Sequence, residues 1–145
     1  MKTTIYRDTR GFGTLTDEWD DLLARAEPAP IFMHHIYQRT WWQWLGNDDL
    51  VLIAVRNDDD QLVGLAPLYG KINQAGQREL TFVGCVDVSD YLDLVIDAGY
   101  VSGVHQALLD CLADDDVTWE KLYLCSLPHY SNTRRQLAEA SRARG

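Results

Sequence analysis

Cysteine is scarce in this sequence, and the few cysteines present are far apart. Only three occur among 145 residues, and each lies in an apolar run (Cys85, Cys111 and Cys125). The odd number and the absence of a CxxC pair argue against a disulfide framework and against a metal or nucleophilic site. We therefore predict three reduced thiols in the core of a cytoplasmic protein.

Long apolar segments are also absent. No apolar run approaches the ~20 residues that a membrane-spanning helix needs. Residues 1–10 are polar and charged, without the apolar centre of a signal peptide. We expect a soluble protein without a targeting segment.

Basic residues are few, with 13 lysines and arginines against 22 aspartates and glutamates and a formal net charge of −9. No lysine or arginine occurs between Glu79 and Glu120, a stretch that holds many carboxylates. A chain of this charge is a poor partner for nucleic acid or an anionic membrane, so neither is expected. The same stretch would repel a polyanionic ligand unless backbone amides compensate.

Several motifs of common enzymes are missing. The sequence has no Gly-x-Ser-x-Gly elbow and no Walker loop, which excludes the commonest hydrolase and NTPase interpretations. The carboxylates at 58–60 lack the spacing and the glycine of an EF-hand. Ligand spacing is absent among the four histidines, His34, His35, His105 and His129. We therefore predict no metal site.

The richest pattern lies between residues 50 and 96, where four short apolar runs are separated by turn residues. These runs contain many Val, Ile, Tyr and Phe residues, and they predict strands at 50–55, 62–69, 80–86 and 91–96. Gly64 and Pro67 lie in the second run, where a bulge or a sheet edge is expected because proline cannot donate to a ladder. Gly84 in the third run permits a bulge or the close approach of another segment or a ligand.

Helical patterns lie on both sides of these runs. One predicted helix begins at Thr16 and ends before Pro28, and the others cover 32–45, 101–112 and 132–143, with further strands at 3–6 and 122–127. The expected order is β-α-α-β-β-β-β-α-β-α, and a chain of this length fits one domain. We predict an α/β (α+β) fold with a mixed, largely antiparallel twisted sheet and helices on both faces.

The predicted helix at 32–45 has two faces. Helical periodicity places one stripe toward the sheet, formed by Met33, Tyr37, Trp41 and Trp44. His35 and Trp42 fall on the opposite side, about two turns apart. Because an indole away from the core suggests a binding surface, we predict that His35 and Trp42 bind substrate. The alternative is that Trp42 packs under a loop or against a second domain.

Four features, in this order, carry a resemblance to a known family. They are Phe32 ahead of Trp41, Trp42 and Trp44; Gly64-Leu65-Ala66-Pro67-Leu68; Leu80-Thr81-Phe82-Val83-Gly84; and Ser89-Asp90-Tyr91-Leu92-Asp93. The series resembles the cellulose-biosynthesis-type acetyltransferases of the GNAT superfamily, which are similar in turn to the Fem-type aminoacyl transferases of peptidoglycan synthesis. The resemblance spans residues 32–128, and its specificity lies in the order and spacing of short motifs.

The resemblance implies an architecture and an activity. Residues 1–145 would form a GNAT-like domain, the N-terminal half of a two-domain protein. The implied activity is N-acyl transfer from acetyl-CoA or another acyl-CoA to an amine of a cell-envelope or polysaccharide-related acceptor, such as an amino sugar or a peptide. A second GNAT-like domain or a second copy of the chain would complete the carrier pocket.

The resemblance also assigns the acyl-CoA contacts to Val83, Gly84, Gly99 and Gly103. In the family, a glycine-rich turn opens the helix after the fourth strand, and its amides hold a pyrophosphate. Gly99 and Gly103 occupy that place, with Asp97 beside them and no cation near them in the sequence. The alternative is that the two glycines serve only a turn and a helix start.

Asp90 and Tyr91 are the candidate catalytic residues. Acyl transfer needs a base for the attacking amine and an acid for the leaving thiolate, and these two side chains could supply them. Asp90 could instead cap a turn while Tyr91 packs in the sheet. Two further hypotheses stand beside catalysis: a non-catalytic recognition domain that uses Trp42, Asp90 and Tyr91, and an oligomerisation module with an aromatic interface.

Overall fold

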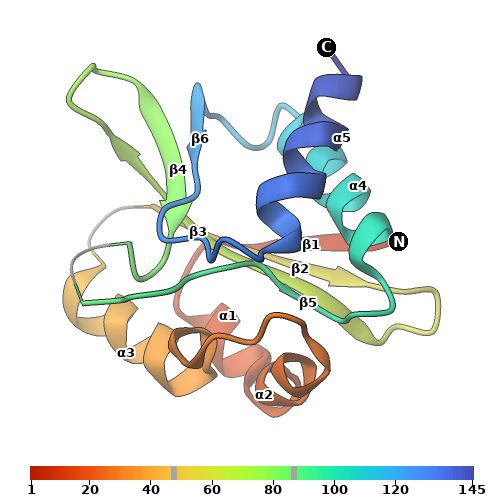
Figure 1. Ribbon diagram of the computed structural model, residues 1–145. Helices are drawn as coiled ribbons and strands as arrows, with labels where there is room; N and C mark the ends of the chain where they lie inside the picture. The colour runs from red at the N-terminus through yellow and green to blue at the C-terminus, as the bar shows by residue number, and fades with distance from the viewer. Residues whose placement is uncertain (47–48, 86–87) are drawn as a thin grey trace.

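A computed structural model describes residues 1–46, 49–85 and 88–145 and contains a six-stranded sheet with helices on both faces (Figure 1). The strands are β1 (Lys2–Tyr6), β2 (Asp49–Arg56), β3 (Leu62–Ile72), β4 (Arg78–Phe82), β5 (Val95–Ile96) and β6 (Lys121–Tyr123). The helices are α1 (Arg10–Thr14), α2 (Thr16–Arg25), η1 (Ile31–Met33), α3 (His35–Leu45), α4 (Val101–Leu112), η2 (Thr133–Leu137) and α5 (Ala138–Ala143). The predicted mixed α+β fold class is confirmed.

The sheet has the order β1-β2-β3-β4-β6, and β5 pairs with β3 beside the end of β4. Every pairing is antiparallel except the parallel pairing of β4 with β6. Figure 1 shows α1, α2 and α3 on one face of the sheet and α4 and α5 on the other. β4 and β6 are parallel, so the chain must return to the same end of the sheet between them. A short turn cannot do this, and α4 forms part of the longer connection.

Pro67 lies inside β3, the central strand, rather than at a sheet edge. The Pro67 carbonyl accepts a hydrogen bond from the Val83 backbone N–H at 2.9 Å. Pro67 lies between the part of β3 that pairs with β4 (residues 68–72) and the part that pairs with β5 (residues 64–65). The missing proline N–H therefore falls where the ladder is already interrupted. A bulge does occur in this run: the pairing of β2 with β3 passes from Val55 opposite Gly64 to Arg56 opposite Leu62, so Val63 is the extra residue.

Three predicted strands are shorter than expected. The third ends at Phe82, and Val86, its predicted last residue, lies outside the described residues. The run at 91–96 forms a strand only at Val95–Ile96, and the run at 122–127 ends as a strand at Tyr123. Leu92 and Leu94 are nevertheless buried. The apolar pattern thus predicted burial correctly but not strand structure. A segment without regular secondary structure can be buried when its backbone groups are hydrogen-bonded, and the Leu92 N–H donates to the Ser126 carbonyl at 3.1 Å.

The helices follow the predictions more closely. α4 has the predicted bounds, and α2 buries Trp19, Leu22 and Leu23 as its periodicity indicates. The predicted last helix begins instead as the π-helical turn η2 and continues as α5. The sequence analysis did not predict α1, in which Gly11 and Gly13 are both poor helix formers.

The cysteine prediction was wrong for two of the three residues. Cys85 and Cys125 form a disulfide, whereas Cys111 is free and buried as expected. The two half-cystines follow β4 and β6, and the parallel pairing of these strands brings residues 40 apart in sequence together. Among the described helices, none combines the length and the apolar character that crossing a membrane requires.

Candidate functional site

The predicted catalytic residues Asp90 and Tyr91 lie on an irregular segment that leads into β5, not on a strand. Both side chains are exposed, and within residues 1–46, 49–85 and 88–145 neither forms a hydrogen bond or an ion pair. The segment is held at both ends. The Tyr37 hydroxyl donates to the Val88 carbonyl at 2.8 Å, and the Leu92 N–H donates to the Ser126 carbonyl. Asp90 and Tyr91 are therefore accessible to a substrate on a fixed stretch of backbone.

Val83 and Gly84, predicted to contact a cofactor, are both buried beneath this segment. The Val83 carbonyl accepts a hydrogen bond from Gln38 Nε2 at 3.1 Å. Gly84 has a φ of +105°, and a Cβ at this position would lie 2.9 Å from Leu92 Cδ2 and 3.2 Å from Ser89 Oγ. The predicted close approach at Gly84 therefore exists, but the partners are side chains of the 89–92 segment.

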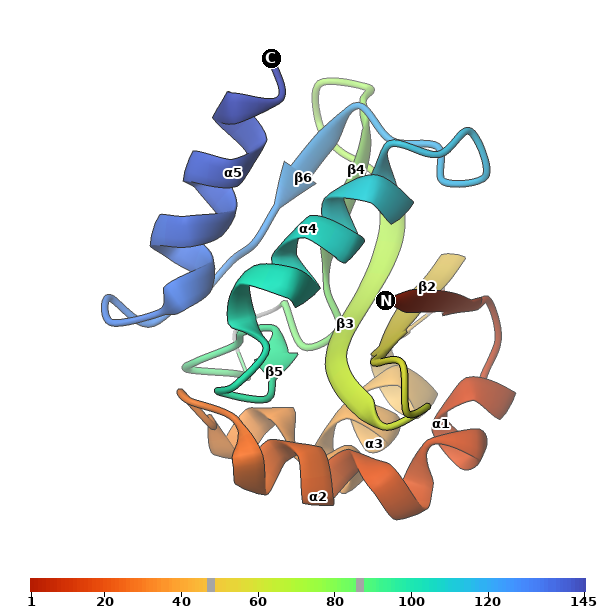
Figure 2. The same ribbon diagram turned by 90° about the vertical axis from the view of Figure 1, so that its right-hand side faces the viewer.

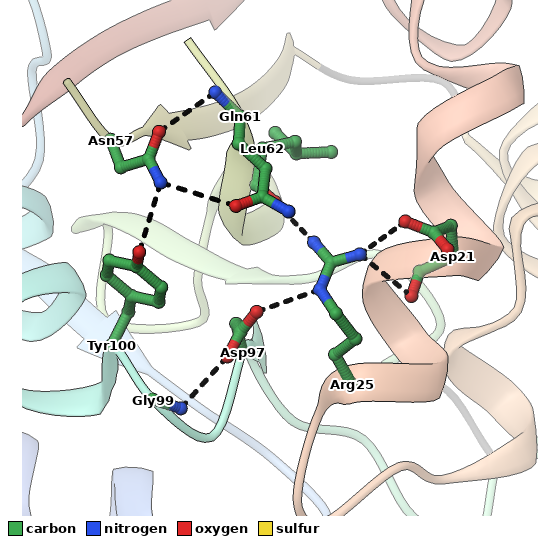
Figure 3. Close-up of polar contacts among 8 residues, drawn as sticks. All are labelled: Asp21, Arg25, Asn57, Gln61, Leu62, Asp97, Gly99 and Tyr100. Atoms are coloured by element: carbon green, nitrogen blue, oxygen red, sulfur yellow. Dashed lines mark hydrogen bonds and ion pairs between the residues drawn. The ribbon is translucent and has the colours of Figure 1, made fainter. Parts of the chain in front are cut away.

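Gly99 lies in a turn where a polar network already uses its amide (Figure 3). The Gly99 N–H donates to Asp97 Oδ1 at 2.9 Å, and Asp97 Oδ2 accepts from Arg25 Nε at 2.8 Å. Arg25 also donates to the Leu62 carbonyl at 2.8 Å and pairs with Asp21. The sequence showed no cation near Gly99, and the structure brings one there from α2.

The electrostatics of this turn are unfavourable for a pyrophosphate. Burial acts to raise the pKa of Asp97, but the hydrogen bonds from Arg25 and Gly99 outweigh burial and hold that pKa below its ordinary value. One guanidinium thus faces two carboxylates, Asp21 and Asp97, which leaves a net negative charge. Gly103 contacts the N-terminus, because a Cβ there would lie 2.4 Å from Met1 Cε. These contacts account for both glycines as parts of a turn and a helix.

The predicted exposure of His35 and Trp42 was wrong. His35 is 6% exposed and Trp42 is 7% exposed, whereas Trp44, predicted to face the core, is 77% exposed. α3 begins only at His35, and its buried side is formed by His35, Gln38, Trp41 and Trp42. The preceding His34 is extended, with ψ of 144°, so Met33 does not belong to the same helical stripe. Residues of α1 and α2 also cover this side of α3.

His35 is fully engaged in that packing. Its Nε2 lies 2.7 Å from the Phe12 carbonyl, and its ring meets the rings of Phe12 and Trp19 edge-on. Trp42 packs its ring 5.7 Å from that of Tyr69, measured between centroids. His35 is therefore a core residue, and only Trp42 of this pair reaches a cavity.

That cavity, which we call the N-terminal cavity, has a volume of about 480 Å³ and lies between α1 and α3. It is lined by Thr9, Phe12, Gly13, Arg39, Trp42, Gln43 and Gly46. In the part of the chain that the structure describes, the Arg39 guanidinium has no carboxylate partner. The cavity thus combines an aromatic wall with a cation, an amide and a hydroxyl.

A second cavity, the C-terminal cavity, has a volume of about 510 Å³ and is lined by residues of α4, β6, η2, α5 and the loops between them. Figure 2 shows α4, β6 and α5 beside one another, and Figure 1 shows α4 and α5 on the opposite face of the sheet from α1 and α3. Its lining is rich in leucine: Leu109, Leu112, Trp119, Glu120, Lys121, Leu122, Leu124, Leu127, Thr133, Arg134, Leu137, Ala138 and Ser141. A smaller apolar void shares four of these leucines and extends to Ala66 and Leu68 on β3. The leucine lining therefore continues inward as far as the sheet.

Thr133 connects the C-terminal cavity to a buried carboxylate, Asp93. The Thr133 hydroxyl donates to Asp93 Oδ1 at 2.5 Å, and the Leu94 N–H donates to the same oxygen at 2.8 Å. Asp93 is 1% exposed, and its Oδ2 has no hydrogen-bond partner among the described residues. Burial raises the pKa of Asp93, against the lowering effect of its hydrogen-bond donors. Sequence reasoning did not select Asp93 as a site residue, although an acid within an apolar run was an available signal.

Comparison with known proteins adds little. No protein-family model matches this chain, and no curated protein matches it. Among solved structures, the chain is similar to a crystal structure of a mutant BH1408 protein from Bacillus halodurans, with 11% sequence identity and a TM-score of 0.43. The alignment covers 100% of this chain and 92% of that chain. Neither the fold nor the function of this chain is inferred from this likeness.

Proposed function

We propose that this chain is the acyl-binding domain of an N-acyltransferase, which transfers an acyl group from an acyl thioester such as acyl-CoA to an amine. The observation that carries the proposal is that the 89–93 segment is hydrogen-bonded to the chain around the C-terminal cavity, although it does not itself line that cavity. Leu92 bonds to Ser126, between the lining residues Leu124 and Leu127, and Asp93 bonds to the lining residue Thr133. The candidate catalytic pair thus lies on a segment that hydrogen bonds attach to the lining of the C-terminal cavity.

The roles of Asp90 and Tyr91 follow from what the reaction needs. The amine nitrogen attacks the thioester carbonyl, the C–N bond forms and the C–S bond breaks. Asp90 takes the proton that the amine loses, and Tyr91 supplies one to the leaving thiolate. Both side chains are exposed, so an acceptor can reach them, and the backbone that carries them is held at Val88 and Leu92.

The family resemblance supplies the rest of the proposal. It indicates an acceptor of the cell envelope or a polysaccharide, such as an amino sugar or a peptide. It also indicates a second GNAT-like domain or a second copy that completes the site. The turn at Gly99 is occupied by Asp97 and Arg25, so we expect the phosphates of the carrier to be held elsewhere.

Mass spectrometry of acylated amines tests the proposal. The chain is incubated with acyl-CoA and either glucosamine or a lysine peptide, and the acylated acceptor is quantified. Asp90→Asn and Tyr91→Phe should each lower the rate of transfer by a factor of about 10² to 10⁴. Asp59→Asn, which changes an exposed acid in the 57–61 turn, should leave the rate unchanged. Absence of product with every acceptor, alone and with a second domain supplied, would remove the catalytic proposal.

A second candidate function is non-catalytic recognition, favoured by the N-terminal cavity. Arg39 and Gln43 could bind a carboxylate or hydroxyls of a peptide or amino sugar, while Trp42 offers an apolar face. Arg39→Gln should weaken binding of such probes in calorimetry, and Arg142→Gln on α5 serves as the control. The exposed Trp44 leaves oligomerisation as a third outcome, which Trp44→Ala would reveal as a lower mass in solution.

A further inference from the structure

The size of the C-terminal cavity bears on which acyl group the chain takes. Its volume of about 510 Å³ falls within the roughly 300–1,000 Å³ of small-molecule sites. Leu109, Leu122, Leu124 and Leu127 are half-buried there, so they expose apolar surface that a ligand can cover. An acetyl group carries a single methyl group and would leave most of this surface in water.

The depth of the cavity points the same way. Leu112, Leu122, Leu124 and Leu137 line both the cavity and the small void beneath it, and that void ends at Ala66, Leu68, Leu94 and Leu108. The void is too small for a separate ligand. It lies where the end of a chain entering from the cavity would lie.

The charged residues that line the C-terminal cavity bear on the charge of its ligand. No lysine or arginine occurs between residues 79 and 120, yet Lys121 and Arg134 both line this cavity. Glu120 also lines it and keeps its negative charge, because its Oε2 accepts only the neutral Arg78 backbone N–H at 2.8 Å. Lys121 Nζ lies 3.6 Å from Glu79 Oε2, and Arg134 is exposed without an ion pair among the described residues. Arg134 therefore leaves an unpaired positive charge beside the leucine wall, and this charge complements an apolar chain with a negative group.

We propose that the acyl group of this domain is a fatty acyl chain of about eight or more carbons, bound in the C-terminal cavity with a negative group of its carrier, or of the free acid, near Arg134. This inference rests on the proposed function and names its substrate class. This negative group, or head, is either the phosphates of a thioester carrier or the carboxylate of a free fatty acid. The chain itself is recognised by burial of apolar area, which stabilises by about 0.8 kcal/mol per CH₂ group.

Calorimetry on the full chain tests the inference with acetyl-CoA, butanoyl-CoA and octanoyl-CoA, and with octanoate in a separate arm. Full burial corresponds to about fourfold in Kd per CH₂ group. We expect octanoyl-CoA to bind at least tenfold more tightly than acetyl-CoA. Binding of octanoate at a similar affinity would identify the carboxylate as a sufficient head, and weaker binding of octanoate would identify the carrier phosphates.

Filling the cavity provides the matched control. Ala138→Trp and Ser141→Trp place an indole among the lining residues, whereas Ala143→Trp places one on the exposed face of the same helix. Either of the first two should reduce octanoyl-CoA binding to the acetyl-CoA level, and the third should not. The use of two filling variants guards against one that fails to fold.

The outcomes separate this inference from the proposed function. Chain-length dependence that Ala138→Trp or Ser141→Trp abolishes, without any transfer, supports the inference and removes the catalytic proposal. Transfer with equal affinity for acetyl-CoA and octanoyl-CoA overturns the inference and leaves the catalytic proposal standing. Equal affinity for octanoyl-CoA in the filled variants and in the Ala143→Trp control would also overturn the inference. So would a dimer, at the concentrations used for calorimetry, in which a second copy of the chain covers the C-terminal cavity.

Discussion

Arg25 donates from Nε to Oδ2 of Asp97 at 2.8 Å, although 72 residues separate the two. The backbone follows the same contact, since the Ala98 N–H donates to the Arg25 carbonyl at 3.0 Å. The pair joins the end of α2, on one face of the sheet, to the turn that starts α4 on the other face. The two helical layers are thus connected around the edge of the sheet at β5.

Arg25→Ala should therefore destabilise the fold by about 2 to 3 kcal/mol, because it removes a charged hydrogen bond to Asp97 and the bond to the Leu62 carbonyl. Urea denaturation measures the change. The control is Arg10→Ala, which breaks a fully exposed pair with Asp8 and should leave the midpoint unchanged. Because the pKa of Asp97 lies below its ordinary 3.8, the contribution of the pair is present above pH 3.8 and is lost as pH falls through the folded-state pKa. Equal midpoint shifts for the two variants would contradict this account.

His105 predicts a separate loss of stability in mild acid. Burial lowers the pKa of this α4 histidine from 6.5 to about 4, and its Nε2 has no partner among the described residues. A depressed pKa means that stability is full above pH 6.5 and falls as the unfolded chain takes up a proton between pH 6.5 and about 4. The slope for one proton is at most about 1.4 kcal/mol per pH unit.

Measuring the unfolding free energy from pH 7 to pH 4 checks this slope. His105→Leu should flatten the curve in that window, whereas His129→Leu, at an exposed position, should retain it. A wild-type curve without a decline between pH 6.5 and 4 would show that His105 is protonated in the folded chain.

Local pattern accounts for what could be predicted. The bounds of α4 and the buried face of α2 follow from periodicity within a single element, and the strands β2 and β3 follow from runs that turns delimit. The face of α3 was not predictable in this way. Its buried side, with His35 and Trp42, depends on cover from α1 and α2.

The site residues were harder to predict than the fold, since contacts between distant elements define them. The disulfide of Cys85 and Cys125 exists only because β4 and β6 are parallel neighbours. The approach of Arg25 to Gly99 depends on the packing of α2 beside β5. The C-terminal cavity arises where α4, β6 and α5 meet, and none of these elements carries a motif on its own. Asp90 and Tyr91 could be selected by residue type, but their position on an irregular segment could not be predicted.

Two glycines that face different neighbours offer a test of packing. A Cβ at Gly64 would lie 2.5 Å from Cγ1 of Val104, whose branched side chain has little freedom to move, so Gly64→Ala should cost about 1 to 3 kcal/mol. A Cβ at Gly103 would meet only the flexible end of Met1, and alanine is the better helix former, so Gly103→Ala should stabilise by up to about 1 kcal/mol. Thermal melts compare the two variants. Loss of acyl-CoA binding in Gly103→Ala would instead support the cofactor role that the family resemblance assigns to Gly103.

Thiol titration distinguishes the paired cysteines from the free one. Chain unfolded without reductant should show one reactive thiol, that of Cys111, and reduction should raise the number to three. Cys111→Ser should show none before reduction. In the native state the thiol of Cys111 should react slowly because the side chain is buried and burial raises its pKa. Three reactive thiols without reductant would restore the prediction made from the sequence.

Asp93 predicts a gain in stability on removal of a charge. Its pKa is raised by burial, so the folded state favours the protonated acid; that contribution is full below pH 3.8 and is lost as pH rises through the folded-state pKa. Asp93→Asn keeps an acceptor for Thr133 and Leu94 and removes the buried charge. The variant should be more stable than wild type at pH 7 by about 1 to 2 kcal/mol, and the difference should shrink toward pH 4. Asp90→Asn, at the exposed neighbouring acid, is the control. A loss of stability that does not depend on pH would show instead that the hydrogen bonds from Thr133 and Leu94 favour the charged form of Asp93.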